Sequence, residues 1–323
     1  MYKIIIVLIL CGLSVSFAQE KTTIKPSKNI VKYTLKSNFP VNVQHLYELI
    51  DTSKTTRIFS DSTSQTYDRV VKYYFSVWAS SAPSSDKVQE VSVSVDSLEY
   101  TMYSGGATVF YNSQSDDIRP PKIDDFNNYV ATLGLEFDLA YSAYDEVGDI
   151  KGSLYESKIN MLKDPKTMIS DSILSFVWND KLGKASLTTY FDVVKNIYPQ
   201  NKVAIDSTWI KNINYDLEGA TISDSVQFVL KNFNMKNYII EGSTINAHSL
   251  ANDQAVLGSI RSIAHVIGAN GHSNYNIKLS LRGNVEELNI ISDFDIDYKI
   301  RNDSIKQKVH SSRTWKLFGM YKI

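Results

Sequence analysis

The chain has 323 residues, and its 34 Lys and Arg nearly balance its 35 Asp and Glu, which gives a formal charge of −1. Nucleic acids and anionic membranes bind clustered positive charge, so this composition favours neither as a partner. Tyr, Phe, Val and Thr are abundant, whereas Gly is scarce at 14 residues. This usage favours a sheet over a helical bundle.

The N-terminal segment, residues 1–18, has the features of a secretory signal peptide. Lys3 gives a positive start, and the apolar run after it is too short to cross a bilayer. Ser16 and Ala18 place small residues three positions and one position before the polar Gln19. The sequence therefore predicts export to the periplasm or the extracellular space, with cleavage after Ala18 and no transmembrane segment in the mature chain.

The single cysteine, Cys11, leaves a second export route open. A lipoprotein signal would be cut just before this residue, which would then carry the lipid anchor. Leu10 disfavours that route, because the cleaving enzyme requires a small residue at this position. With cleavage after Ala18 the mature chain has no cysteine, so its stability must come from burial rather than from disulfides.

The elements that follow are predicted from the alternation of apolar with polar residues and from Gly and Pro. Residues 19–29 form a polar, flexible leader, and the first β-rich half covers residues 30–152. Within it, the polar residues 51–54 predict a turn between two short strands. Longer strands are predicted at residues 67–78 and 88–103.

A short amphipathic helix and a hairpin close this half. Apolar residues recur at helical spacing from Phe126 to Leu133. From Leu133 to Gly152, apolar and polar residues alternate on both sides of a Gly-bearing turn, which predicts an antiparallel hairpin. The same pattern returns from Tyr275 to Ile291, so we predict two related sheet halves.

The middle of the chain changes its period. Apolar residues recur at helical spacing in residues 153–200, which predicts a helical insert, and the second β-rich half covers residues 201–323. Residues 253–267 are compatible with either a helix or a strand, because their apolar residues recur at helical spacing but Gly258 weakens a helix. The predicted fold class is α+β, mainly β: two antiparallel sheet halves, or one large curved sheet, covered by the central helical insert.

Short motifs spread over most of the mature chain resemble one family. They are Tyr47 followed by alternating Thr and Ser through Gln65, residues 88–100, Val109 to Ser113, residues 133–152, and Pro199 to Trp209. On these motifs the chain is similar to an uncharacterised family of sheet-rich envelope proteins of Gram-negative bacteria, which carry signal peptides and form a domain of unknown function. The resemblance implies export and a sheet-rich build, and it implies no activity and no catalytic residue.

The histidines give no metal-site pattern. None forms an i, i+4 pair around an acidic residue, so the sequence does not favour a zinc site. His265 and His272 are close enough in sequence to form a functional cluster, but exposed histidines are the favoured interpretation. The five are His45, His248, His265, His272 and His310.

Acidic and serine residues give no catalytic or calcium-site pattern either. Asp293, Asp295 and Asp297 alternate with apolar residues and lack the Gly and the later Glu of a calcium loop, so we expect the wet face of a strand, with weak cation binding as the alternative. The segment Glu241 to Ile245 has one of the two glycines of a nucleophile elbow. No catalytic, cofactor-binding or metal-ligating residue is therefore predicted.

Eight aromatic residues on neighbouring predicted strands have two interpretations. They either fill the layer between sheet and helices, which we favour, or line a concavity that binds an apolar ligand. They are Tyr73, Tyr74, Phe75, Trp78, Tyr100, Tyr103, Phe110 and Tyr111.

The predicted function is that of an exported envelope protein with a non-enzymatic binding or structural role, without cofactors, acting on an unknown envelope component. The alternative is a periplasmic carrier of lipid or another apolar ligand in a concavity between sheet and helices. A carrier requires a pocket there, whereas a hydrolase requires titratable side chains that converge in one cleft.

Overall fold

The computed structural model describes most of the chain from residue 30 onward. Residues Lys32–Ile323 form one compact unit. The expected signal peptide, the leader and Cys11 lie outside the described residues. The structure describes residues 30–79, 81–82, 89–116, 119–142, 144–163, 172–250, 254–257 and 262–323.

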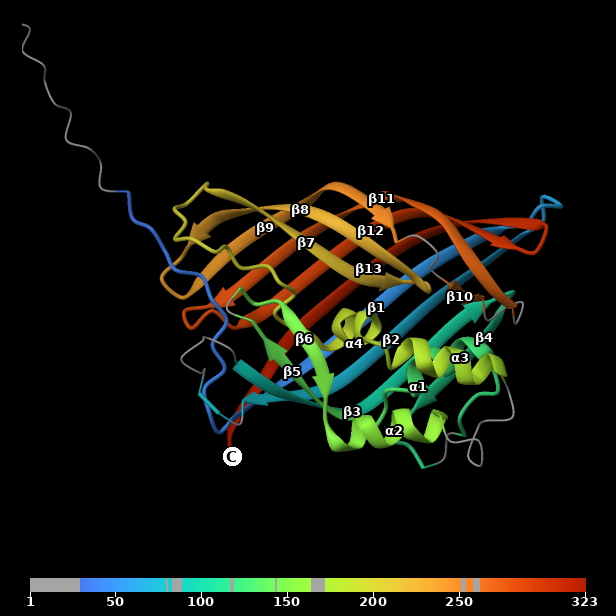
Figure 1. Ribbon diagram of the computed structural model, residues 1–323, viewed down its shortest axis with the longest axis horizontal. Helices are drawn as coiled ribbons and strands as arrows, with labels where there is room; N and C mark the ends of the chain where they lie inside the picture. The colour runs from blue at the N-terminus through green and yellow to red at the C-terminus, as the bar shows by residue number, and fades with distance from the viewer. Residues whose placement is uncertain are drawn as a thin grey trace, which may run out of the picture. The chain divides into compact units, whose positions relative to one another are not determined.

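The described residues form 13 strands, all in one antiparallel sheet, and four helices (Figure 1). The predicted fold class is confirmed, with one large curved sheet rather than two. The strands are β1 (Val43–Ile58), β2 (Ser64–Ala79), β3 (Gln89–Ser104), β4 (Ala107–Asn112), β5 (Glu136–Tyr141), β6 (Val147–Lys151), β7 (Thr208–Leu217), β8 (Ala220–Phe233), β9 (Asn237–Ser249), β10 (Gln254–Leu257), β11 (Ser262–Ser280), β12 (Val285–Ile300) and β13 (Asp303–Lys322). The helices are α1 (Asp124–Val130), α2 (Ser153–Lys163), α3 (Ser172–Lys181) and α4 (Lys184–Phe191).

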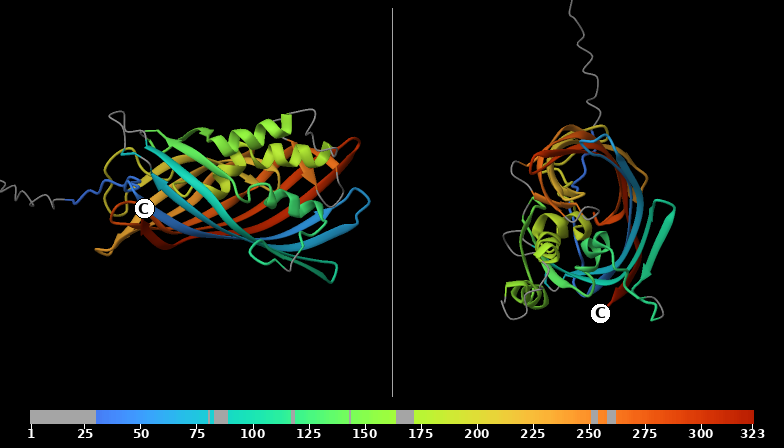
Figure 2. Two further views of the ribbon diagram at one scale, coloured as in Figure 1. Left: turned by 90° about the horizontal axis from the view of Figure 1, so that it is seen from below. Right: turned by 90° about the vertical axis from the view of Figure 1, so that its right-hand side faces the viewer.

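Most strands that are consecutive in the chain are neighbours in the sheet. The order is β6-β5-β3-β2-β1-β13-β12-β11-β9-β8-β7, with β4 paired to β3 and β10 paired to β11. The first strand therefore pairs with the last, from Val43 opposite Lys322 to Ile58 opposite Lys306. The sheet stays open between β6 and β7, and α2, α3 and α4 come from the chain between these two edge strands. Figure 2 shows the strands in an arc, with the helices on its open side.

The concave face of the sheet and α4 share the core. In the central strands every second side chain is buried, as the alternation in the sequence predicts. Phe191, at the end of α4, has ring centroids of Tyr73, Phe75 and Phe137 within 6.0 Å. The indole nitrogen of Trp315 donates to the Tyr190 carbonyl oxygen at 2.7 Å. These contacts fix α4 inside the curve of the sheet.

Several sequence predictions can be compared directly with these elements. The predicted helix after Phe126 corresponds to α1, and α2, α3 and α4 lie within residues 153–200. Both predicted hairpins form, as β5 with β6 and as β11 with β12. The first of them turns through Asp145, at φ +63°, instead of a glycine. Residues 253–267, for which the sequence left helix and strand as alternatives, form strand wherever they are described, in β10 and the start of β11.

The predicted turn at residues 51–54 is wrong, because β1 continues through it. Asp51 and Ser53 point inward and are buried, and a carboxylate oxygen of Asp51 lies 3.2 Å from Nε of Arg313. Polar residues that a turn would present to solvent therefore serve a buried ion pair. The sequence around them does not distinguish the two cases.

Gly283 is the turn residue of the β11–β12 hairpin, and an alanine there should destabilise the fold. Its φ is +87°, and an added Cβ would lie 1.8 Å from the backbone oxygen of Lys36. Gly106 has a similar φ of +82° with nothing within 4 Å, so Gly106→Ala should cost only the backbone strain, about 1–2 kcal/mol. Gly283→Ala should cost about 1–3 kcal/mol more, in line with overpacked sites. Urea unfolding measures both variants, and equal losses would contradict the clash with Lys36.

Candidate functional site

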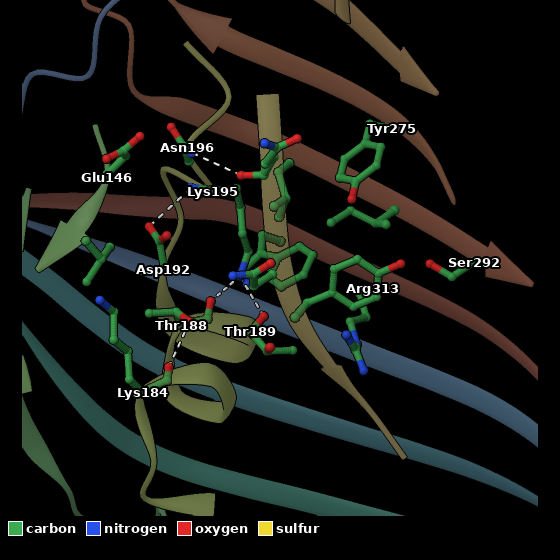
Figure 3. Close-up of a pocket in the computed structure, with 17 residues that line it drawn as sticks. Glu146, Lys184, Thr188, Thr189, Asp192, Lys195, Asn196, Tyr275, Ser292 and Arg313 are labelled. Carbon is green, nitrogen blue, oxygen red and sulfur yellow. Dashed lines mark hydrogen bonds between the residues drawn. The ribbon is translucent and has the colours of Figure 1, made fainter. Parts of the chain in front are cut away.

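A cavity of about 310 Å³ lies between α4 and the concave face of the sheet (Figure 3). Residues of α4 and of the segment after it form one wall, and β7, β11, β12 and β13 form the other. Part of the lining also comes from the edge strands β6 and β7, where the sheet is open. The apolar and aromatic lining residues of the sheet are Ile213, Tyr215, Tyr275, Ile290 and Trp315.

Asp192 ends α4 and shapes the wall of the cavity. Its carboxylate accepts the backbone N–H groups of Val194 and Lys195, at 2.8 and 3.1 Å, and the hydroxyl of Tyr141 at 2.9 Å. Burial raises the pKa of Asp192 despite these bonds. Lys195 and Asn196 then take positive φ values of 53° and 50°, which reverse the chain. The predicted helical spacing ran on to Ile197, but this turn stops the helix at Phe191.

Lys195 is the buried cation of this wall. Its Nζ donates to the carbonyl oxygens of Thr188 and Thr189, at 2.5 and 2.6 Å, and lies 4.5 Å from the ring centroid of Trp315. Figure 3 shows these bonds at the end of the helix. Burial lowers the pKa of Lys195 to about 7. The ammonium group thus caps the last carbonyls of α4.

Arg313 is the second buried cation of the cavity. Besides its ion pair with Asp51, it donates to the backbone oxygen of Asp216 at 3.0 Å. The carboxylate of Asp216 is in turn 2.6 Å from Nζ of Lys181. The two buried positive charges that reach the cavity, Lys195 and Arg313, therefore have partners within the protein.

Four buried serines form a row across the concave face. Ser53, Ser311, Ser292 and Ser273 lie directly opposite one another on β1, β13, β12 and β11. The Oγ of Ser273 is 2.8 Å from that of Ser292 and 2.8 Å from the Tyr215 hydroxyl. Ser292 lines the cavity, and its small side chain leaves room there.

Several buried polar atoms in and near this row, the Oγ of Ser53 among them, have no hydrogen-bond partner among the described residues. Two others are the hydroxyl of Tyr275 and one carboxylate oxygen of Asp224. Burial raises the pKa of Asp224 to about 6. Because buried polar groups in proteins are normally bonded, this part of the core retains unused hydrogen-bonding capacity.

A second buried cluster, on the concave side of the sheet, joins β2 to α1 and to the turn between β7 and β8. Arg69 on β2 contacts Asp125 of α1, at 3.0 Å, and Glu218 of the β7–β8 turn. The hydroxyl of Tyr67 donates to Glu218 at 3.0 Å. Burial alone would raise the pKa of Glu218, but Arg69 and Arg57 outweigh burial and lower it to about 2. On the side of Glu218 this cluster leaves only about 20 Å³ of free volume, whereas a hollow of about 350 Å³ borders it at Tyr67 and Asp125.

The structure does not bring the five histidines together. Four of the five are exposed, and His310 pairs with Asp293 at 2.7 Å on the outer face. The exception is His45, which is fully buried against the ring of Phe39, and nothing in the sequence pattern indicated this. No three His, Cys, Asp or Glu side chains of the described ranges are arranged to hold a metal ion.

The acidic, serine and aromatic residues considered in the sequence analysis lie partly on the exposed face of the sheet and partly in the core. Asp295 and Asp297 are exposed, as expected for the wet side of a strand, opposite Lys308 and Lys306. Ser243, from the segment with one elbow glycine, is exposed on β9. Of the eight aromatic residues, four lie in the core, and Tyr103 and Phe110 are about half exposed. The four core residues are Tyr73, Phe75, Tyr100 and Tyr111.

Sequence reasoning missed the residues that surround the cavity. Asp192 and Lys195 belong to a segment read as helix, and Arg313 to an ordinary polar and apolar alternation. The only local signal was that two charged residues, Asp192 and Lys195, closely follow the apolar residues of α4. Titratable side chains do meet at this cavity: Asp192, Lys195 and Arg313 each have a bonding partner in the fold, whereas the hydroxyl of Tyr275 has none among the described residues.

The fold and the cavity define a class of protein: a mainly antiparallel sheet that curves around a helix, with a cavity of about 310 Å³ between them. Residues 86–286, more than half of the chain, match the model of a family of unknown function, DUF6263, and the chain belongs to that family. Comparison with curated proteins gave no match. Among the described helices, none is both long enough and apolar enough to span a membrane.

Solved structures show only a remote likeness. OccK1 (OpdK) of Pseudomonas aeruginosa is 8% identical over 88% of this chain and 100% of its own, with a TM-score of 0.19. OmpF of Salmonella typhi, in complex with daunomycin, is 8% identical over 84% and 97%, also with a TM-score of 0.19. OccAB4 of Acinetobacter baumannii is 7% identical over 87% and 99%, again with a TM-score of 0.19. At these values the likeness supports no conclusion on fold or function.

Proposed function

We propose that this protein is an exported, non-enzymatic binding protein that holds a small molecule in the cavity between α4 and the concave face of the sheet. The observation that carries the proposal is the cavity itself. Its volume of about 310 Å³ lies at the lower end of the range of small-molecule sites, roughly 300–1,000 Å³. Its lining combines aromatic and aliphatic side chains with a few polar groups, which is typical of such sites.

The charges around the cavity favour a neutral ligand. Lys195 caps α4 and lies close to Asp192, and Arg313 pairs with Asp51. Lys184 and Glu146, also in the lining, are exposed and of opposite sign. An ionised ligand would leave its charge unmatched in a partly buried site, which costs free energy. A ring or short chain with one or two hydroxyl groups fits this lining.

The bonding of the same side chains supports a non-enzymatic role. Nucleophilic catalysis needs a nucleophile within reach of a base, and the histidines lie away from the cavity. Ser292 bonds to Ser273, and the Nζ of Lys195 donates to two carbonyl oxygens. Each group maintains the fold around the cavity.

A lipid carrier that uses this concavity has less support. The ring of Phe191 at the end of α4 packs on Tyr73 and Phe75 of the sheet, so these rings occupy space between helix and sheet. These residues belong to the continuous core of the sheet. The space left beside α4 fits a small molecule better than a lipid with two chains.

Filling the cavity tests the proposal. Ile290 is half-buried and lines the cavity, whereas its neighbour Ile291 points to the other face of β12. The neutral probe 2-naphthol, with two rings and one hydroxyl, should bind the wild type in a fluorescence titration. Ile290→Trp should weaken its binding about tenfold or more, or about 1.4 kcal/mol. The control Ile291→Trp should bind it like the wild type. Absence of binding to the wild type, or equal affinities for all three proteins, would overturn the proposal.

A further inference from the structure

A second hollow, separate from the cavity beside α4, lies between α2, α3 and the start of β5. Its volume is about 500 Å³. Leu154, Lys158, Met161 and Leu162 lie on one side of α2 at helical spacing and face this groove. Leu154 and Met161 are 53% and 56% exposed, so the groove presents apolar surface to solvent. Leu135 forms its floor.

The polar groups of the groove are chiefly hydrogen-bond donors. The Nζ of Lys158 donates to the Ala131 carbonyl oxygen and lies 5.7 Å from the ring centroid of Trp178. No carboxylate within the described ranges forms an ion pair with it. The indole N–H of Trp178 is buried and has no acceptor among the described residues. An ammonium group has three donor hydrogens, so Lys158 retains donors after its bond to Ala131.

These observations specify a ligand. Apolar walls of this size match a single hydrocarbon chain, and the remaining donor hydrogens of the Lys158 ammonium match a group that only accepts hydrogen bonds. A carboxylate is such a group. Its negative charge would pair with the half-buried ammonium of Lys158, which has no ion-pair partner among the described residues. We propose that the α2–α3 groove binds single-chain amphiphiles with an anionic head, with Lys158 at the head group and Leu154 and Met161 along the chain.

Lys158 also has a purely structural interpretation. Its bond to Ala131 caps the C-terminal end of α1, and its stem covers Trp178. That role alone would make Lys158→Met lower the thermal stability without changing the preference between anionic and cationic amphiphiles. The charge preference therefore separates the two interpretations, and the stability does not.

Calorimetric titration of the full mature chain, below the micellar concentration, tests the site. Dodecanoate should bind the wild type more tightly than dodecyltrimethylammonium, which has the same chain and the opposite charge. Lys158→Met retains a side chain of similar length without the charge. It should weaken dodecanoate about tenfold or more, as expected for a lost hydrogen bond between charged groups. The affinity for the cationic amphiphile should stay equal or rise.

Two controls make the result specific. Lys163→Met, on the exposed end of the same helix, should leave dodecanoate binding unchanged. Ile290→Trp should also leave it unchanged, because that residue lines the other cavity. The proposal is overturned if dodecanoate does not bind, if both amphiphiles bind equally, or if Lys158→Met binds dodecanoate like the wild type. None of these outcomes alters the 2-naphthol result, so the two proposals can fail separately.

Discussion

Arg69→Ala is expected to lower the free energy of unfolding by about 3–5 kcal/mol, the cost of breaking a buried ion pair by removing one partner. Arg69 is 3% exposed, and its two partners, Asp125 and Glu218, are 15% and 7% exposed. The variant would leave two carboxylates close together in a region that water hardly reaches. Because Glu218 belongs to the β7–β8 turn and Asp125 to α1, the loss should also loosen the contact between these elements. Chemical denaturation monitored by circular dichroism measures the effect.

The matched control is Lys72→Ala, on the same strand. Lys72 pairs with Glu99 at 3.3 Å, but its side chain is 37% exposed. An exposed pair contributes about 0.2–1 kcal/mol, so this variant should change little. Adding Glu218→Gln to Arg69→Ala should restore part of the loss, because it removes one of the uncompensated charges. A loss in Arg69→Ala no greater than in the control would show that the cluster does not stabilise the fold.

The cluster also has a pH signature. The pKa of Glu218 is lowered from 4.5 to about 2 in the folded chain. Between these values the unfolded chain binds more protons, so this group's contribution is fully present above pH 4.5 and is lost as the pH falls toward 2. In Arg69→Ala the lowering should largely disappear, and the stability of the variant should fall less steeply over this pH range.

Trp315→Ala should have the second large effect, also about 3–5 kcal/mol, as for large-to-small substitutions of buried aromatic residues. Trp315 is fully buried on β13 and joins this strand to α4 and to the segment that follows α4. Its ring lies under the Lys195 ammonium, and its indole N–H bonds to the Tyr190 carbonyl oxygen of α4. Without it, α4 loses its anchor on the sheet, and the wall of the cavity loses its largest side chain.

Two further variants separate the contributions of Trp315. Trp315→Phe keeps most of the apolar contact but leaves the Tyr190 carbonyl oxygen without its donor, so it should cost about 1–3 kcal/mol. Phe318→Ala, three residues further along β13, removes a ring that is 54% exposed and contacts Tyr74 edge to face. It should cost less than about 1.5 kcal/mol. Thermal unfolding ranks the three, and a Phe318→Ala loss equal to that of Trp315→Ala would contradict the placement of α4.

The error at residues 51–54 shows how inward polar residues mislead a reading of the sequence. Asp51 follows Ile50 in a run that contains Thr, Ser and Lys, which is a common turn composition. In the fold this carboxylate faces Arg313, which is far away in the chain. Turn and buried ion pair use the same residue types, and only the partner strand distinguishes them.

The sequence by itself determined the elements whose cause is local. Alternating burial along β2 and β13, the helical period of α4 and the turn at Gly283 appear in neighbouring residues, because one face of each element is apolar or one position needs a positive φ. The tertiary structure alone decided the pairing of β1 with β13, the cavity beside α4 and the α2–α3 groove. Their walls come from Lys195, Tyr275 and Trp315 in one case and from Leu135, Lys158 and Trp178 in the other. Such spaces exist only where distant side chains fail to fill the volume between packed elements, and no local pattern records that.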